Sequence, residues 1–151
     1  MMTQANYLLL AHALYSARIQ SLKEQLKKLK ATLSDEDYKQ HEVVKMASRL
    51  YKATFEIIPA DPTCPEYLLR DELKKFRRYK QGLQRYRLFF TFSKTPPIIV
   101  YLYVNDEKHL RKEGSKNDPY EQFSKLVKKG SISHDPRDPK MHKLLQKLSG
   151  L

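Results

Sequence analysis

Residues 85–92 read Arg-Tyr-Arg-Leu-Phe-Phe-Thr-Phe, an aromatic run that is entered through two arginines. Successive side chains of a β-strand point to opposite faces, so this pattern predicts a strand with one apolar face. We expect Leu88, Phe90 and Phe92 on the core face, and Arg85, Arg87 and Phe89 on the opposite face. The strand therefore defines both a core and a cationic surface.

The residues before this strand are also cationic. Residues 74–87 contain seven lysines and arginines and no acid. We predict that residues 75–80 form the hairpin partner through a loop at residues 81–84. This register sets Lys80 opposite Arg85, Arg78 opposite Arg87 and Phe76 opposite Phe89. Like charges directly opposite each other destabilise a sheet by up to about 1 kcal/mol per pair. Four cations on one patch therefore indicate a polyanionic ligand, of which a phosphate backbone is the simplest.

The charge of the whole chain is distributed unevenly. The sequence has 151 residues and a formal net charge of +12. Residues 1–73 hold ten Lys/Arg and ten Asp/Glu, whereas residues 74–151 hold nineteen and seven. This asymmetry favours a nucleic-acid partner, with a membrane surface as the competing interpretation. No apolar run approaches the ~20 residues of a spanning helix and no signal peptide is evident, so we expect a cytoplasmic protein that does not bind membranes.

The first half of the chain predicts helices. Residues 7–12 are an apolar run that suits a strand or the start of a helix, and we favour the strand. Apolar residues then recur at helical spacing over residues 16–33. Ser34 and the acids after it suit the N-terminus of a second helix, which we expect to continue to Pro59. The sheet is therefore preceded by two packed helices.

The second half predicts most of the sheet. Residues 67–69 suit a short strand, and residues 98–104 are apolar on both faces, as in a central strand. Beyond them we expect a helical turn at residues 106–111, a helix from Asp118 to Gly130 and an amphipathic tail helix at residues 140–148. The fold class is α+β, with one domain at residues 1–130 and a linker and tail helix at residues 131–151.

Three groups of residues are candidates for chemistry. The first is the set of cations Arg78, Lys80, Arg85 and Arg87, whose guanidinium groups suit phosphate. The second is Asn105-Asp106-Glu107 with Arg111, which serves a turn and helix cap equally well. The third is Tyr120, which suits base stacking, proton sharing or plain packing.

Several functional classes lack their motifs. The five histidines share no ligand spacing, and the single Cys64 excludes a Cys-rich zinc site, so we expect no metal. No glycine-rich phosphate loop or Gly-x-Ser-x-Gly elbow is present, which argues against nucleotide hydrolysis and acyl transfer.

The residues resemble one toxin family. The similarity to the YhaV toxins of PrlF-YhaV toxin-antitoxin systems, which are RelE-like endoribonucleases, is dense over residues 78–130 and does not cover the tail from Ser131. It is carried by Arg85-Tyr86-Arg87-Leu88-Phe89-Phe90, Val104-Asn105-Asp106-Glu107, Leu110-Arg111, Gly114, Lys116, Asp118, Tyr120, Phe123-Ser124-Lys125 and Lys129-Gly130. Gln81 and Gln84 depart from the aromatic residue and glycine expected in the hairpin turn.

This resemblance implies a RelE-like α+β fold with helices on an antiparallel sheet, metal-independent cleavage of mRNA, and an AbrB-like PrlF antitoxin. The 2′-hydroxyl of the RNA would attack the adjacent phosphate, without cofactor.

As catalytic residues we predict Arg78, Lys80, Arg85, Arg87, Arg111 and Tyr120, with Lys80 as the candidate base because neighbouring cations lower a lysine pKa. As RNA-binding residues we predict Lys75, Arg77, Asn105 and Lys116. The alternatives are a non-catalytic ParE-like toxin that binds DNA gyrase, or a plain RNA-binding module, and the sequence leaves ribosome dependence open.

Overall fold

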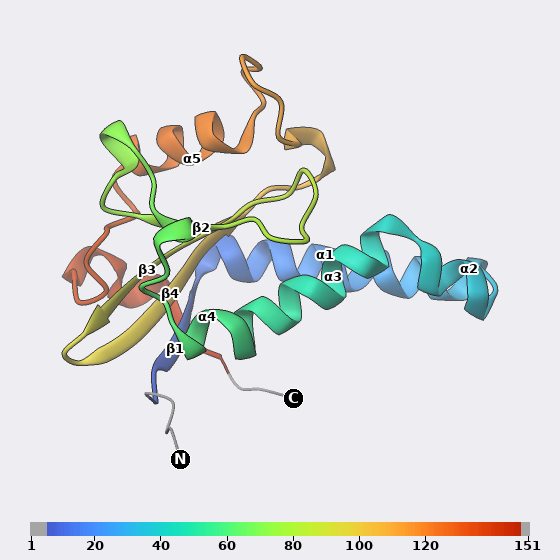
Figure 1. Cartoon of the computed structure of the whole chain (residues 1–151), viewed down its shortest axis with the longest axis horizontal. Coiled ribbons are helices and arrows are strands. Elements are labelled where there is room, and N and C mark those ends of the chain that lie inside the picture. Colours follow the sequence, from blue (N-terminus) through green and yellow to red (C-terminus); the bar gives the residue numbers. More distant parts are fainter. Residues whose placement is uncertain (1–5, 149–151) are drawn as a thin grey trace.

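A five-stranded mixed sheet organises the molecule (Figure 1). The computed structural model describes residues 6–148. The strands are β1 (Leu8–His12), β2 (Arg77–Tyr79), β3 (Leu88–Lys94), β4 (Pro97–Val104) and β5 (Leu145–Lys147), in the order β2-β3-β4-β1-β5. The α+β class and the central position of residues 98–104 are confirmed. The expectation of an antiparallel sheet is wrong in one pairing, because β1 runs parallel to β4.

Helices from the first half of the chain cover one face of this sheet. The helix predicted at residues 16–33 is α1 (Ala13–Thr32), and the strand favoured at residues 7–12 is β1. Figure 1 shows α1 and α3 (Glu42–Lys52) side by side, extending beyond the sheet toward α2 (Asp35–Gln40).

The second predicted helix is interrupted. His41 is extended, with φ −66° and ψ 136°, and its Nδ1 accepts a hydrogen bond from the Val43 backbone N–H at 3.1 Å. The break therefore acts as the N-cap of α3 and gives this helix a direction of its own. Helix α3 runs into a π-helical turn (η1, Ala53–Ile57) and a last turn (α4, Ile58–Ala60), which ends just after Pro59 as predicted.

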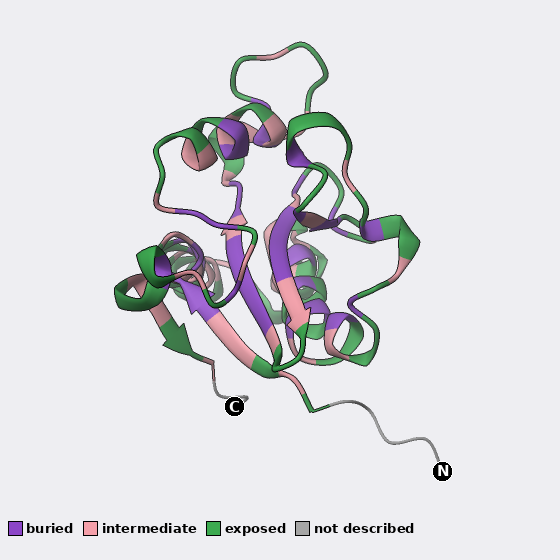
Figure 2. Cartoon of the chain, turned by 90° about the vertical axis from the view of Figure 1, so that its left-hand side faces the viewer, coloured by how far each residue is buried: buried purple, intermediate pink, exposed green. Residues whose placement is uncertain are grey.

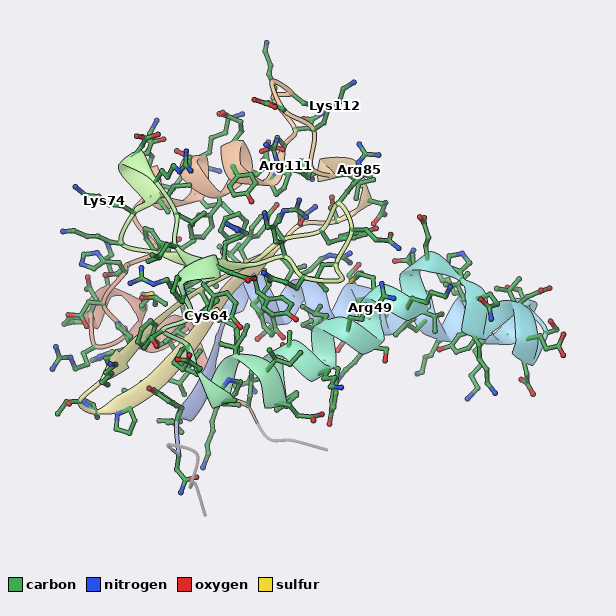
Figure 3. The ribbon with its side chains drawn as sticks, viewed as in Figure 1. Arg49, Cys64, Lys74, Arg85, Arg111 and Lys112 are labelled. Carbon is green, nitrogen blue, oxygen red and sulfur yellow. The ribbon has the colours of Figure 1, made fainter. Side chains whose placement is uncertain are left out.

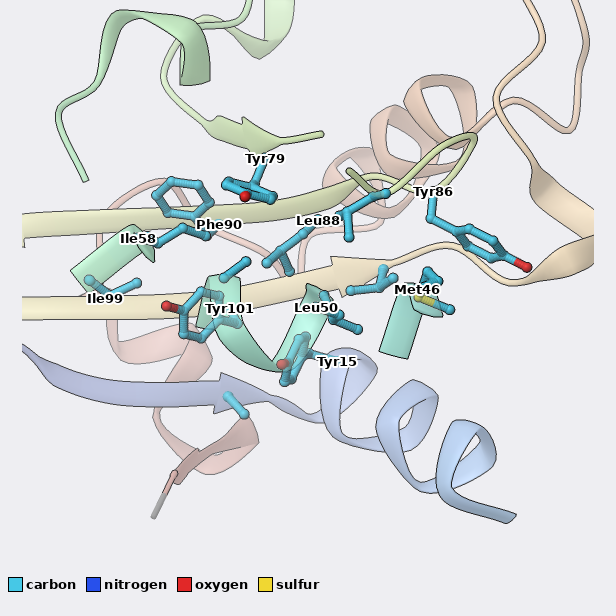
Figure 4. Packing of buried hydrophobic residues seen from close by; sticks show 14 of the residues in the cluster. Tyr15, Met46, Leu50, Ile58, Tyr79, Tyr86, Leu88, Phe90, Ile99 and Tyr101 are labelled. Atoms are coloured by element: carbon cyan, nitrogen blue, oxygen red, sulfur yellow. The ribbon is translucent and has the colours of Figure 1, made fainter. Parts of the chain in front are cut away.

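The core on this face joins the sheet to α1, α3 and the π-helical turn (Figure 4). Two buried phenols bind to Thr54 in that turn. Tyr15 Oη lies 3.0 Å from Thr54 Oγ1, and Tyr101 Oη donates to the Thr54 carbonyl at 2.6 Å. Because a buried hydroxyl without a partner is costly, these bonds fix the turn against the sheet. The largest fully buried side chains of this core are Met46, Leu50, Ile58, Leu83, Leu88, Phe90, Ile99 and Tyr101.

Helix α5 (Pro119–Lys128) covers the opposite face. It begins at Asp118, whose side chain caps it, and is followed by Gly130 at φ +91°, as the sequence predicted. Phe123 stacks on Phe89 of β3 with ring centres 4.3 Å apart and meets Phe76 edge-on at 5.1 Å. Figure 2 shows that β3 and β4, between the helical layers, are buried along most of their length.

The C-terminal segment completes the sheet. The tail helix predicted at residues 140–148 is wrong, because a 3₁₀ helix (η5, Pro139–Leu144) is followed there by strand β5. Strand β5 pairs with β1 from Leu10↔Lys147 to His12↔Leu145, and the Leu148 N–H donates to the Leu9 carbonyl at 2.9 Å. The strand satisfies backbone groups of β1 that an edge would leave unpaired, and Met141 is fully buried beside α5.

Two shorter predictions differ in outcome. The strand expected at residues 67–69 is wrong, since Pro65–Tyr67 form a 3₁₀ turn and only Leu68 bridges to Arg77. The helical turn expected at residues 106–111 is confirmed as η4 (Glu107–His109). Within residues 6–148 no helix is long and apolar enough to cross a membrane.

Candidate active site

The cationic hairpin pairs in a different register from the predicted one. Strands β2 and β3 pair through Arg77↔Phe90, Arg78↔Phe89 and Tyr79↔Leu88. The predicted pairs Lys80–Arg85, Arg78–Arg87 and Phe76–Phe89 are therefore wrong, although the shift of two residues keeps Arg78 on the face of Phe89.

The physical reason lies in the loop. Residues 80–87 make two consecutive turns that bury Leu83 completely and leave Tyr86 8% exposed. The turns are closed by hydrogen bonds from the Leu83 N–H to the Lys80 carbonyl at 3.0 Å and from the Tyr86 N–H to the Leu83 carbonyl at 2.9 Å. Burial of two apolar side chains favours this longer loop over the four-residue turn expected from spacing alone.

Asn105 holds this loop to the end of β4. Its side chain is fully buried, and Oδ1 accepts a hydrogen bond from the Arg87 N–H at 2.7 Å. Its Nδ2 donates to the carbonyls of His109 at 2.8 Å and Arg85 at 3.3 Å. All of these partners are backbone groups, so Asn105 positions two loops. It does not reach solvent as an RNA-binding residue would.

Arg85 and Arg111 lie side by side on the two loops (Figure 3). The Arg111 N–H donates to the Arg85 carbonyl at 2.8 Å, and Arg85 Nε donates to the Arg111 carbonyl at 3.1 Å. Arg111 Nη1 also pairs with the nearly buried Asp118 carboxylate at 2.7 Å. Asp118 additionally accepts hydrogen bonds from the backbone N–H groups of Lys112 and Tyr120. Arg111 is therefore fixed to the N-terminus of α5.

Tyr120 lies in the first turn of α5 beneath this arginine. The Arg111 Cζ stands 5.0 Å from the centre of the Tyr120 ring, within cation–π distance. The same ring meets Phe89 edge-on at 5.5 Å. Tyr120 is half-buried, so it packs against the sheet and also presents its phenol to a cationic surface.

Arg78 and Arg87 are two cations with little compensation. Arg78 is 8% exposed, and burial lowers the pKa of its guanidinium, which Tyr120 acts to raise and Arg87 to lower. Arg87 and Tyr120 therefore lie close enough to Arg78 to affect its charge. Both arginines have a buried Nε without a hydrogen-bond partner, and neither pairs with a carboxylate within residues 6–148. Their Nη atoms reach only carbonyls, those of Glu66 at 3.4 and 3.5 Å for Arg78 and those of Gln84 and Tyr86 for Arg87.

The structure does not bring the other predicted cations into contact with this cluster. Lys80 is exposed just after β2, and Lys116 is exposed in the loop before α5. Lys75 is exposed in the turn before β2, and Arg77 places its Cζ 5.6 Å from the centre of the Phe92 ring. No hydrogen bond or ion pair of the described residues ties these four to Arg78, Arg87 and Tyr120.

His109, for which the sequence predicted no role, lies beside Asp106 in this region. Its Nδ1 lies 2.7 Å from Asp106 Oδ1. Its carbonyl accepts a hydrogen bond from Asn105 Nδ2, which also donates to the Arg85 carbonyl. Burial acts to raise the pKa of Asp106, but hydrogen bonds from His109 and the Lys108 N–H lower it overall. A carboxylate that orients an imidazole is an arrangement suited to proton transfer. The Asp-x-x-His spacing after the central strand was the available signal. No three His, Cys, Asp or Glu side chains gather as a metal site among residues 6–148.

Comparison with known proteins assigns the chain to a family. The family described as a toxin with endonuclease activity, of a toxin-antitoxin system, matches residues 9–147. The chain belongs to the YhaV toxin family. It is 33% identical over 135 residues to "Ribonuclease toxin YhaV" of Escherichia coli strain K12 and equally to "Toxin YhaV" of Escherichia coli O157:H7, which covers 86% of this chain and 85% of each relative. No solved structure matches.

Membership of the YhaV family decides between the functional alternatives. The protein is a toxin with endonuclease activity, and it has an antitoxin as partner. A non-catalytic gyrase-binding toxin is therefore not favoured. The match runs to residue 147, so it includes the C-terminal segment that the resemblance left uncovered.

Proposed function

We propose that this YhaV family toxin is an endoribonuclease whose active centre is the cluster Arg78, Arg85, Arg87, Arg111 and Tyr120. The observation that carries the proposal is that Arg78 is buried, that Arg87 is half-buried with its Nε buried, and that neither pairs with a carboxylate within residues 6–148. A buried charge is costly unless it is paired, and an entering phosphate would supply the missing acceptors. The name of the Escherichia coli relative, "Ribonuclease toxin YhaV", supports RNA as the substrate.

The proposed reaction needs no covalent enzyme intermediate. The 2′-oxygen of one nucleotide attacks the adjacent phosphorus in line, and the bond from phosphorus to the 5′-oxygen breaks. A base takes the proton of the 2′-hydroxyl, and an acid gives a proton to the leaving 5′-oxygen. The products carry a 2′,3′-cyclic phosphate and a 5′-hydroxyl.

The arginines and Tyr120 have distinct parts in this scheme. Arg78 and Arg87 donate to the non-bridging oxygens, on which negative charge grows in the transition state. Arg85 lies at the rim and binds the incoming phosphate. Arg111, fixed by Asp118, orients Tyr120 so that its phenol can protonate the leaving oxygen. These roles use donors that the fold holds in place before the substrate arrives.

Two side chains are candidates for the base. Lys80 is exposed at the start of the hairpin loop, and His109 is oriented by Asp106. Replacing each with alanine separates them, since loss of the base removes the corresponding limb of the pH–rate profile.

The antitoxin is proposed to be an acidic PrlF-like protein of the AbrB type that covers this cationic surface in the cytoplasm. The mRNA would be cleaved either free or on the ribosome. The excess of cations in residues 74–151 supports a partner of opposite charge.

The experiment is incubation of the purified protein with a long RNA, with and without EDTA, and separately with ribosomes, followed by analysis of the new ends. We expect 2′,3′-cyclic phosphates at equal rates with and without EDTA. Products with 5′-phosphates, or activity that only an added divalent ion restores, would refute the proposed reaction.

A further inference from the structure

A second cationic pocket lies at the opposite end of α5 from the active centre. It has a volume of about 400 Å³ and is lined by Lys74, Lys75, Arg77, Thr91, Phe92 and His134. Figure 3 shows Lys74 near one end of α5, and Arg85 and Arg111 near the other. Three of the six lining residues are permanent cations, and none is an acid.

The turn that carries the lysines is built to present them outward. Leu73 and Phe76 are buried against α5, whereas Lys74 and Lys75 between them are exposed. The turn is closed by a hydrogen bond from the Phe76 N–H to the Leu73 carbonyl at 2.9 Å. It is also tied to α5, because Ser124 Oγ donates to the Glu72 carboxylate at 2.7 Å. The two lysines are therefore held at one place by a fixed backbone.

Arg77 forms the floor of the pocket. Its guanidinium lies over the Phe92 ring and donates to the carbonyls of Lys74 and Phe76 at 3.3 and 3.0 Å. It pairs with no carboxylate within residues 6–148. Arginine over an aromatic ring is a surface on which phosphates and bases of single strands bind.

The far wall of the pocket is the loop after α5, fixed by a hydrogen bond from Thr91 Oγ1 to the His134 carbonyl. Asp135 and Asp138 follow His134 in this loop. Each is already engaged, Asp135 by the Arg137 N–H and guanidinium and Asp138 by the Lys140 N–H. Neither acid pairs with Lys74, Lys75 or Arg77, which form no ion pair within residues 6–148.

The pocket and the active centre share the edge strand β2. Arg77 and Arg78 are consecutive, so their Cα atoms are about 3.8 Å apart, yet Arg77 lies at the pocket and Arg78 near Tyr120. Because consecutive side chains of a strand point to opposite faces, an RNA strand whose cleaved phosphate lies at Arg78 and Arg87 would cross the edge of β2 to reach Arg77 and the lysines.

We propose that this pocket binds a backbone phosphate of the RNA strand, outside the bond that is cleaved. The inference rests on the proposed function, since it takes the same RNA strand as ligand. The pocket would contribute to RNA affinity equally in the ground state and in the transition state. Loss of the pocket should raise KM and leave the rate at saturation unchanged.

The test compares two double variants of the full chain with the same charge change. K74E/K75E alters the pocket, and K27E/K28E alters exposed lysines on α1. The probe for binding is a 20-nucleotide RNA whose 2′-hydroxyls are all methylated, which blocks the proposed attack. Affinity is measured by fluorescence anisotropy at several salt concentrations, and cleavage is measured with unmodified RNA. Thermal unfolding checks that both variants fold.

We expect K74E/K75E to weaken binding by about tenfold or more relative to K27E/K28E. We also expect it to reduce the log–log salt slope by about 0.7 for each lost phosphate contact. The cleavage rate at saturating RNA should match that of K27E/K28E. Inorganic phosphate at the RNA concentration should not displace the probe.

Three results would overturn the inference while leaving the proposed function intact. They are equal RNA affinity of the two variants, displacement of the probe by equimolar inorganic phosphate, and a K74E/K75E defect confined to neutralisation by the antitoxin. Failure of the proposed function looks different, because the wild-type protein would then cleave no RNA in any of these measurements.

Discussion

The guanidinium carbon of Arg111 lies 5.0 Å from the centre of the Tyr120 ring, and Asp118 fixes both residues at the N-terminus of α5. We expect Tyr120→Phe to keep the packing of the ring on Phe89 and to lose the proton donor. The cleavage rate should fall by about 10²- to 10⁴-fold at unchanged RNA affinity. Single-turnover cleavage and RNA binding measure the two effects. A Tyr120→Phe protein as fast as wild type would restrict Tyr120 to packing.

Asn105 should contribute to stability more than to RNA affinity. Asn105→Ala leaves the Arg87 N–H and the His109 carbonyl without their buried partner. We expect the free energy of unfolding to fall by about 2 to 4 kcal/mol, because buried polar groups lose their hydrogen bonds. Urea denaturation measures the change. If Asn105→Ala weakened RNA binding at unchanged stability, Asn105 would be an RNA contact as the sequence suggested.

Met141 tests the packing of the C-terminal segment. It is fully buried among the apolar residues that pack around α5. We expect Met141→Ala to lower the free energy of unfolding by about 2 to 5 kcal/mol, since a cavity replaces the side chain. The exposed neighbour His142 supplies a control, because His142→Ala should have little effect. Equal stability of the two variants would mean that the segment does not belong to the core.

The Asp106–His109 pair should make stability depend on pH in the acid range. The pKa of Asp106 is lowered in the folded protein from its ordinary 3.8, so its charged form stabilises the fold. This contribution is fully present above the unfolded pKa and is lost as pH falls through the folded pKa. We therefore expect the wild type to exceed Asp106→Asn in stability above pH 3.8, with the difference closing below it. A difference that stays constant from neutral to acid pH would contradict this origin.

The sequence predicted those elements whose pattern is local. The apolar part of the predicted strand, residues 88–92, belongs to β3, and the apolar run at residues 98–104 defined β4. The extension of the strand to Arg85–Arg87 was wrong, because these residues lie in the loop before β3. Ser34, Asp118 and Gly130 marked helix ends correctly. The prediction of a tail helix was wrong because apolar residues at helical spacing also suit a 3₁₀ turn followed by an edge strand. Only the free edge of β1, which no local pattern reveals, selects the strand.

For the candidate site, too, the sequence predicted local features and missed those that depend on tertiary structure. The sequence indicated the clustered arginines and Tyr120 as candidates. In the folded protein, Arg87 and Tyr120 lie close enough to Arg78 to affect its charge. The hairpin register depended on burial of Leu83 and Tyr86 inside the loop, which spacing does not report. The scaffold role of Asn105 depended on backbone groups from two separate loops, so it required the tertiary structure.

Buried Arg78 and half-buried Arg87, neither paired with a carboxylate within residues 6–148, are proposed to stabilise the phosphate during cleavage. The most direct test of this proposal is the single-turnover cleavage rate of Arg78→Ala and Arg87→Ala, with Lys28→Ala on α1 as control and thermal unfolding measured for all three. We predict that each arginine variant cleaves RNA about 10²- to 10³-fold more slowly than wild type, as expected for loss of a transition-state donor, whereas Lys28→Ala is unaffected. Folded Arg78→Ala and Arg87→Ala proteins that cleave RNA at the wild-type rate would contradict it.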